Sequence, residues 1–174
     1  MGSTPTESFI LGPAELTSTV YQLGHYGIAL LCYAPVARLL VEAGEPQAAL
    51  CGGLLVAGAA VVPDCDEHLP IPHRGPTHTV WFAAAVGLVV AGTVAALSAI
   101  TGLRFHWTLV GGLLAAGAVF THVAADAATP MGIRPFAPLS DRHVTLDLVA
   151  SNHRTTNAGL FLLGGATVAI ATVI

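Results

Sequence analysis

Five stretches of the sequence consist almost entirely of apolar residues, and their lengths limit what the chain can fold into. They cover residues 21–41, 47–62, 79–101, 106–127 and 156–174. A helix needs about 20 apolar residues to cross the hydrocarbon core of a bilayer, so the stretch 47–62 alone is short. Hydrophobic residues make up 54% of the chain and charged residues 9%, against about 25% charged in soluble proteins. The sequence therefore predicts an all-α integral membrane protein, a bundle of about five helices.

The first 20 residues differ in character from the rest of the chain. Residues 1–20 are mostly polar and form a predicted N-terminal arm, and residues 21–174 form a single predicted membrane-embedded domain. The net charge of −4 comes without a basic patch, which excludes nucleic acid as a partner and leaves membrane lipid as the expected one. The three cysteines, Cys32, Cys51 and Cys65, form no C-x-x-C pair and predict no disulfide framework.

Acidic residues and histidines gather between the second and third apolar stretches. Residues 62–68 read VPDCDEH, and residues 73–79 read HRGPTHT. Carboxylates and imidazoles this crowded repel one another or change protonation unless a cation holds them together. Oxygen and nitrogen donors of these types suit divalent ions, zinc first and Mn, Fe or Mg as alternatives. This segment is the predicted centre of a metal site.

Further candidate ligands fall on the same face of the predicted bundle. His122 and Asp126 are one helical turn apart, and so can bind one ion together. With five spans, the start of the first, the segment 63–78 and the end of the fourth lie at one membrane face. The predicted ligands are His25, Asp64, Asp66, His73, His78, His122 and Asp126. They exceed the needs of one tetrahedral ion, so we expect one or two divalent ions, a pair lying about 3.5–4 Å apart.

Two residues near these ligands have predicted catalytic roles. The guanidinium of Arg74 suits an anionic, phosphoryl-like oxygen of a substrate. Glu67 is either a general base or a solvated residue at a helix end. Thr77 or Thr79 is expected to support a ligand through a hydrogen bond.

Several histidines have a simpler alternative interpretation. A single histidine in a membrane helix is commonly a hydrogen-bonding contact between helices; this is our interpretation of His106 and the alternative for His25. His143 and His153 are expected in a loop, with Asn152 and His153 as alternative residues lining the site. His68 and His73 are weaker candidates than His78.

The arginines predict the orientation of the chain in the membrane. The face with the candidate ligands carries Arg74, Arg134, Arg142 and Arg154, and the opposite face carries Arg38 and Arg104. Positive residues are enriched in cytoplasmic loops, so we expect a multi-pass protein of the cytoplasmic (inner) membrane whose motif loops face the cytoplasm.

The motifs resemble those of the YdjM-like family of inner-membrane-associated, metal-dependent hydrolases. The resemblance covers residues 24–138 and rests on a leading Gly-His pair, P-D-x-D, H-R-G-x-T-H-T, H-x-x-x-D-x-x-T-P-x-G and a closing P-F-x-P. The H-R-G-x-T-H block is the most specific. The chain departs from the family where Glu67 and His68 follow the second aspartate. The resemblance implies a helical membrane protein with a hydrolytic metal site, of a type comparable to zinc-dependent phospholipase C at the level of fold.

These observations predict a membrane-bound, metal-dependent hydrolase acting on a phosphoester or a lipid-linked substrate at the membrane face. An ion or metal transporter is one alternative, although transporters hold their ionisable groups near mid-membrane. A non-enzymatic scaffold with a structural metal is the other, and its ligand shell would be closed.

Overall fold

The computed structural model describes residues 13–148 and 153–173, and it is helical as the sequence predicts. The helices are α1 (Pro13–Glu42), α2 (Pro46–Ala60), α3 (Val80–Thr101), α4 (His106–Ala127) and α5 (Arg154–Val173), with short 3-10 helices η1 (Val62–His68) and η2 (Pro76–His78). Within these ranges no strand forms, and a single β-bridge joins Ile133 to Val144. Five spans are long and apolar enough to cross a membrane. The predicted five-span helical bundle is confirmed.

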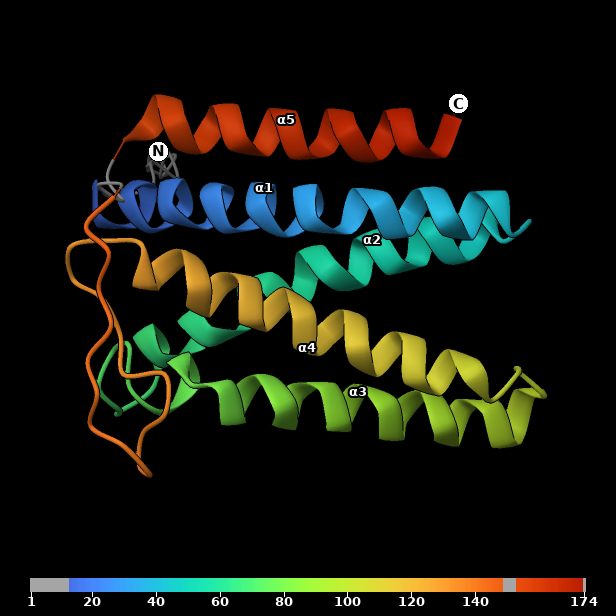
Figure 1. Ribbon diagram of the computed structural model, residues 1–174, viewed down its shortest axis with the longest axis horizontal. Coiled ribbons are helices and arrows are strands. Elements are labelled where there is room, and N and C mark those ends of the chain that lie inside the picture. Colours follow the sequence, from blue (N-terminus) through green and yellow to red (C-terminus); the bar gives the residue numbers. More distant parts are fainter. Residues whose placement is uncertain (1–12, 149–152, 174) are drawn as a thin grey trace, which may run out of the picture.

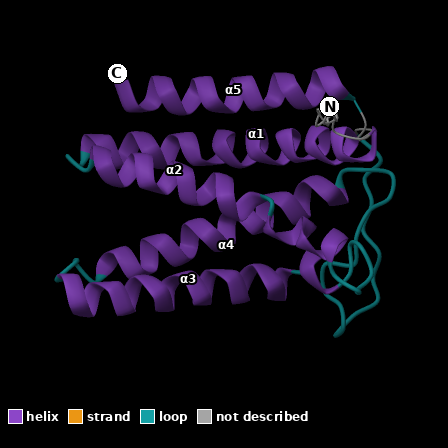
Figure 2. Cartoon of the chain, turned by 180° about the vertical axis from the view of Figure 1, so that it is seen from behind, coloured by secondary structure: helices purple, strands orange, loops and turns teal. Residues whose placement is uncertain are grey.

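The helices form a flat bundle whose two outer pairs are joined by a crossing helix (Figure 1). α5 packs along α1, α3 packs along α4, and α2 contacts both α1 and α4. α1 and α4 approach each other at the end that carries the long loops and diverge toward the other end, as the view from behind also shows (Figure 2). The bundle is therefore closed at one end and wedge-shaped at the other.

Glycines set the close approach of the two outer helix pairs. A β-carbon added at Gly164 of α5 would overlap the backbone oxygen of Gly27 in α1. Between α3 and α4, a β-carbon at Gly87 would press on the backbone oxygen of Gly112. Membrane helices use small residues in this way because packing contacts, rather than a hydrophobic driving force, hold them together in lipid.

The bounds of two elements differ from the prediction. α1 begins at Pro13 rather than at residue 21, so part of the predicted arm is helical, and residues 1–12 lie outside the described residues. α2 ends at Ala60 because Pro63 cannot donate a backbone hydrogen bond and its ring clashes with the preceding turn. The chain continues as η1, which extends the short second stretch into a span of 23 residues, Pro46–His68.

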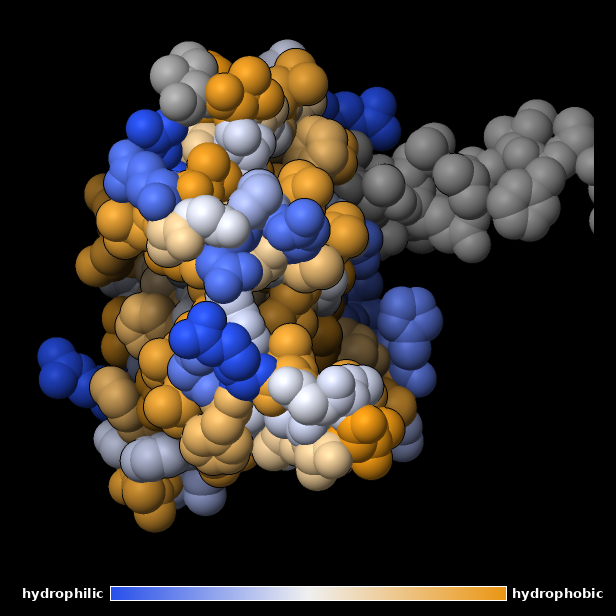
Figure 3. Space-filling view, turned by 90° about the vertical axis from the view of Figure 1, so that its right-hand side faces the viewer, coloured by the Kyte–Doolittle hydropathy of each residue, from blue (hydrophilic) through white to orange (hydrophobic). Residues whose placement is uncertain are grey.

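The distribution of side chains over the surface fits a bilayer environment. Large apolar side chains point outward along the spans, among them Leu54, Leu88 and Ile100, which are 77%, 74% and 80% exposed. Hydrophilic residues gather instead on the end where α1 joins α2 and α3 joins α4 (Figure 3). Apolar flanks between polar ends are expected where lipid tails surround the helices.

Candidate metal centre

Segments that are far apart in the sequence meet at the closed end of the bundle. They are the start of the membrane span of α1, η1, the loop containing η2 and the last two turns of α4, all near the long loops in Figure 1. The titratable residues that contact one another there are His25, Asp64, Asp66, His73, His78, His122 and Asp126. All seven predicted ligands are thus brought together, but they do not hold equivalent positions.

Four atoms form the centre of this group, and we refer to them as the donor cluster. They are Nε2 of His78, Nε2 of His122, Oδ1 of Asp64 and Oδ2 of Asp126. The Nε2 of His122 lies 3.2 Å from that of His78, 3.3 Å from Asp64 Oδ1 and 3.4 Å from Asp126 Oδ2. The Nε2 of His78 lies 3.6 Å from Asp64 Oδ1 and 3.1 Å from Asp126 Oδ2. Tetrahedral zinc with bonds of about 2.0–2.1 Å holds its ligand atoms about 3.3–3.4 Å apart, so these separations fit one ion at the centre.

Hydrogen bonds on the far side of each imidazole aim its Nε2 lone pair into the donor cluster. Nδ1 of His122 lies 2.7 Å from the backbone oxygen of Ala60, to which it can only donate. Nδ1 of His78 lies 3.3 Å from Oδ2 of Asp66 and 3.0 Å from Oγ1 of Thr77. In a neutral imidazole that donates through Nδ1, Nε2 carries no proton. Two lone pairs and two carboxylate oxygens then face each other without a donor between them.

A cation resolves this arrangement. Burial opposes charge on His78, but its hydrogen bonds to Asp126 and Asp64 outweigh burial and raise the pKa of its imidazole. Positive charge is therefore favoured at the donor cluster. A proton can bridge only two of the four atoms, whereas a divalent ion can contact them all. The residues present thus fit a divalent metal.

The 3-10 geometry of η1 gives its two aspartates different tasks. With three residues per turn, side chains two positions apart point about 120° away from each other around the axis. Asp64 therefore reaches the donor cluster, while Asp66 turns to the outer nitrogen of His78. Asp66 accepts hydrogen bonds from Thr77 Oγ1 at 2.8 Å and from the backbone N–H of Arg74 at 3.0 Å. Its position is that of a carboxylate that orients a ligating histidine, rather than of a ligand to the same ion.

Arg74 connects the loop before η2 to the end of α4 through hydrogen bonds. Its Nη2 donates to Oδ1 of Asp126 at 2.9 Å, and its Nη1 donates to Thr129 Oγ1 at 2.8 Å and to the backbone oxygen of Gly132 at 3.4 Å. Its backbone has a φ of 58°, in the left-handed region that non-glycine residues adopt rarely. By engaging one oxygen of Asp126, the guanidinium leaves the other oxygen facing the donor cluster.

Two histidines flank the donor cluster on opposite sides. The ring of His25 stacks on that of His122 with 3.7 Å between centroids, and its Nε2 lies 3.7 Å from Oδ1 of Asp126. The Nδ1 of His25 is buried without a hydrogen-bond partner among the described residues. His73 donates through Nδ1 to Oδ1 of Asp66 at 2.8 Å, and its side chain is 42% exposed. Ligand atoms of His25, His122 and Asp126 lie within 4.8 Å of one another, as do those of Asp64, His73 and His78, so both flanking histidines are close to ligands of the donor cluster.

Other residues considered from the sequence lie apart from the donor cluster. Glu67, Cys65 and His68 are exposed on η1. Thr79 caps α3 by accepting from the backbone N–H of Phe82 at 3.2 Å. The remaining histidines are all exposed: His106 at the opposite end of α4, His143 beside the backbone oxygen of Met131, and His153 just before α5. Asn152 lies outside the described residues.

One partner of the site could not be found from residue types. The oxygen that fixes His122 belongs to the backbone of Ala60, whose side chain gives no hint of this role. It becomes available because α2 ends there, and a carbonyl in the last turn of a helix has no partner further along the helix. Pro63, three residues further along the chain, is the sequence signal for this helix end.

Comparison with known proteins identifies one family over most of the chain. No curated protein and no solved structure matches the chain. The family model described as YdjM inner membrane protein matches residues 21–173, which include every residue of the donor cluster and all five spans. The chain belongs to the YdjM family of inner membrane proteins.

Proposed function

We propose that this chain is a metal-dependent hydrolase that cleaves a phosphoester, soluble or lipid-linked, at the surface of the inner membrane. The observation that carries the proposal is the donor cluster, in which two imidazole nitrogens and two carboxylate oxygens converge with tetrahedral spacing. When bound there, a divalent ion would polarise a phosphoryl oxygen and lower the pKa of a water molecule. Hydrolysis then breaks one P–O bond, with hydroxyl added to phosphorus and a proton to the leaving alcohol.

The ligand types favour a catalytic over a structural ion. Structural zinc sites are built mainly from cysteine thiolates, whereas histidine and carboxylate ligands predominate in hydrolytic zinc sites. The three cysteines are exposed, and none of them is a member of the donor cluster. The site is also not fully sealed, since the side chains of Asp64 and His25 are 11% and 13% exposed. His25 adds a donor next to the cluster, which supports expansion of the shell or a second ion.

Basic side chains beside the site support an anionic substrate. A cavity of about 930 Å³ opens between the start of α3 and the loop after α4. Its lining includes His73, Arg74, Arg134 and His143 together with the apolar ring of Trp81. Positive and hydrogen-bonding groups of this kind suit a phosphoryl oxygen. Both Nη atoms of Arg74 already bind protein oxygens, so we assign it to holding Asp126 and assign Arg134 to the substrate anion.

His25 is our candidate to accept the proton of the attacking water. Its Nε2 faces Asp126, and its Nδ1 has no partner among the described residues, so one nitrogen is free to take a proton. Glu67 is not assigned this role because its side chain is exposed on η1. Replacing His25 by glutamine should therefore reduce turnover more than it reduces metal content.

We further propose that the closed end of the bundle faces the cytoplasm. Arg74, Arg134, Arg142 and Arg154 belong to this end, and Arg38 and Arg104 to the other. The excess of arginine supports this orientation by the positive-inside rule.

The location of the donor cluster argues against a transporter. Transporters hold substrate and coupling ions near the middle of the membrane, in interrupted helices. Here the ligands come from the first part of one span, the last turn of another and the 3-10 helices at the same end. That position favours chemistry at an interface.

The test combines metal analysis with hydrolysis by the detergent-purified full chain. We expect one or two divalent ions per chain and cleavage of bis(p-nitrophenyl) phosphate, both lost in Asp64→Ala and His122→Ala. His106→Ala and Asp141→Ala are matched controls, because both residues are exposed and lie away from the donor cluster. A wild-type protein that binds metal without cleaving phosphomono- or phosphodiesters would support the scaffold, and one that binds no metal would overturn the proposal.

A further inference from the structure

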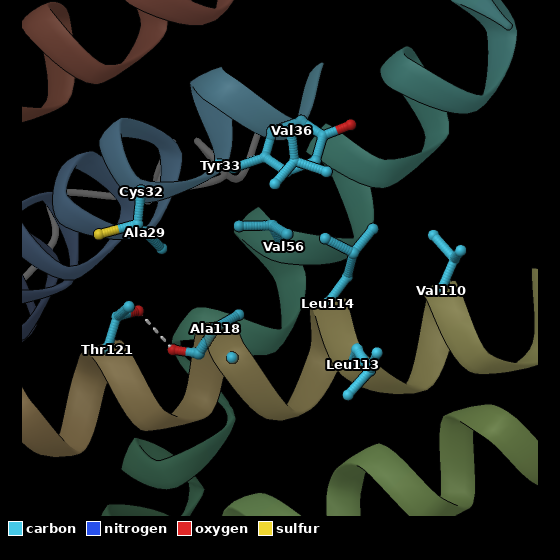
Figure 4. Close-up of a pocket in the computed structure, with 11 residues that line it drawn as sticks. Ala29, Cys32, Tyr33, Val36, Val56, Val110, Leu113, Leu114, Ala118 and Thr121 are labelled. Atoms are coloured by element: carbon cyan, nitrogen blue, oxygen red, sulfur yellow. Dashed lines mark hydrogen bonds between the residues drawn. The ribbon is translucent and has the colours of Figure 1, made fainter. Parts of the chain in front are cut away.

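A second cavity lies within the membrane-spanning part of the bundle, where α1 and α4 diverge (Figure 4). We call it the apolar groove. It has a volume of about 400 Å³, and α1, α2 and α4 all contribute to its walls. Its lining includes Ala29, Tyr33, Val56, Leu113, Gly117 and Thr121. In Figure 4 the side chains from α1 and α4 face each other across this space.

The chemistry of the groove suits hydrocarbon. The hydroxyl of Tyr33 donates to the backbone oxygen of Ala49 at 2.6 Å, and that of Thr121 donates to the backbone oxygen of Ala118 at 2.7 Å. Neither hydroxyl has a hydrogen left for an occupant, and the other lining groups are apolar side chains, glycine and the thiol of Cys32. A polar ligand entering the groove would lose its hydration without replacement, whereas a hydrocarbon chain would not.

The length of the groove is close to the thickness of one leaflet of a bilayer. Its lining on α4 runs from Val110 to Thr121, which is about 16 Å at a rise of about 1.5 Å per residue. Half of a hydrocarbon core that is about 30 Å thick is about 15 Å. A helix of this length and about 10 Å in diameter would occupy about 1,250 Å³. The groove is therefore too small for another helix but long enough for a single lipid chain.

The groove ends at the donor cluster. Ala29 lies one turn below His25 on α1, and Ala118 lies one turn below His122 on α4, each pair sharing a helix face. His25 and His122, whose rings stack on each other, therefore lie just beyond this end of the groove. A molecule lying in the groove would thus have its polar end next to the metal ligands.

We propose that the apolar groove binds one hydrocarbon chain of a membrane lipid and that this lipid's phosphoester head is the substrate of the metal centre. The second half of this statement rests on the proposed function, and the first half does not. Lipid enters the groove laterally, between α1 and α4, from the surrounding bilayer. The substrate is then a lipid of the leaflet on the side of the closed end, not a soluble phosphoester.

Gly117 offers a way to block the groove without disturbing the fold. It lines the groove, and a β-carbon added there would meet no atom within 4 Å. Gly117→Phe should therefore place its ring in the groove. Gly92→Phe on α3 is the matched control, since Gly92 also has open space around its β-carbon and lies outside the groove. Both variants should retain the metal content of the wild type.

The first experiment measures lipid occupancy directly. The full chain is placed in nanodiscs containing a phosphatidic acid with a diazirine in its acyl chain, irradiated and mapped by mass spectrometry. We expect adducts on α1 and α4 at groove residues, at least fivefold fewer in Gly117→Phe and unchanged in Gly92→Phe. Equal labelling of the outer surface of α3, for example at Leu88, with no effect of Gly117→Phe, would overturn the proposal.

The second experiment separates the groove from the chemistry. Hydrolysis of bis(p-nitrophenyl) phosphate is compared with that of a long-chain phosphatidyl p-nitrophenol. We expect Gly117→Phe to raise KM about tenfold for the long-chain ester only. Loss of neither activity in Gly117→Phe would reject the groove as a substrate site and leave the hydrolase intact. Groove labelling in a wild type that cleaves neither ester would establish lipid binding and reject the proposed function.

Discussion

The ion pairs at the two ends of the helical bundle differ in how far they are exposed to solvent. At the open end, Arg38 and Glu42 form an ion pair one helical turn apart, with 2.7 Å between Nε and Oε1. The two side chains are 39% and 52% exposed. At the closed end, Asp126 and His122 are 3% and 0% exposed, and each has several charged or polar neighbours. Exposed pairs need no further partner because water solvates them, whereas buried charges are costly unless they are compensated. The difference fits our proposal that the closed end, and not the open end, binds a cation.

The largest expected effect is at Asp126, which contacts both the donor cluster and Arg74. Asp126→Ala removes a ligand and leaves a mostly buried guanidinium without its carboxylate. We expect metal affinity to fall at least 100-fold, equivalent to about 2.8 kcal/mol. Chelator competition on the detergent-purified protein measures this. Equal affinity in Asp126→Ala and Asp141→Ala would remove Asp126 from the site.

Arg74 should show a smaller effect on the same measurement. Arg74→Gln keeps a hydrogen-bond donor but removes the charge and the fork that hold Asp126 and Thr129. Residues that orient ligands typically change metal affinity about 10–100-fold, and we expect the lower end of that range. Arg142→Gln is the control, because Arg142 is exposed in the loop after α4. An unchanged affinity in Arg74→Gln would show that Asp126 is oriented without it.

Thr77 should have a more modest effect. Its hydroxyl donates to Asp66 and lies beside Nδ1 of His78, so Thr77→Val keeps the shape and removes this link. We expect metal affinity to fall about tenfold with the fold retained. Thr93→Val on α3 provides the comparison, since the hydroxyl of Thr93 donates to the backbone oxygen of Val89, one turn earlier in the same helix.

The open end should respond least. Arg38→Ala breaks an exposed pair, and such pairs contribute about 0.2–1 kcal/mol. We expect the thermal unfolding midpoint and the metal content to stay close to those of the wild type. A loss of metal in Arg38→Ala as large as that in Arg74→Gln would mean that the two ends are coupled and that the contrast between them is wrong.

Much of this contrast could be predicted from the sequence, because it depends on the order of spans. The fourth apolar stretch and α4 share the bounds 106–127. The chain crosses the membrane twice between His25 and His78 and twice more between His78 and His122, so all three histidines lie at one face. Apolar length and helical periodicity carry this information without any knowledge of packing. The confirmed helical membrane fold follows from these signals, and the confirmed family follows from the motifs.

The separate roles of the site residues could not be predicted in the same way. Asp64 and Asp66 look equivalent in the sequence, but the 3-10 turn of η1 sends one to the donor cluster and the other to His78 Nδ1. Arg74 was expected to face a substrate, yet its left-handed backbone and the loop after α4 direct both Nη atoms to protein oxygens. Such roles depend on side-chain direction, which spacing alone does not determine.

The most direct test of the account is X-ray absorption spectroscopy at the metal edge of the purified, zinc-loaded protein. Binding at the donor cluster predicts a first shell of about four nitrogen and oxygen ligands at about 2.0–2.1 Å, with scattering from two imidazoles and without sulfur. His122→Ala should lose one imidazole contribution, and His106→Ala should leave the spectrum unchanged. A shell that contains sulfur, or one without imidazole, would contradict the assignment of the closed end as a metal centre.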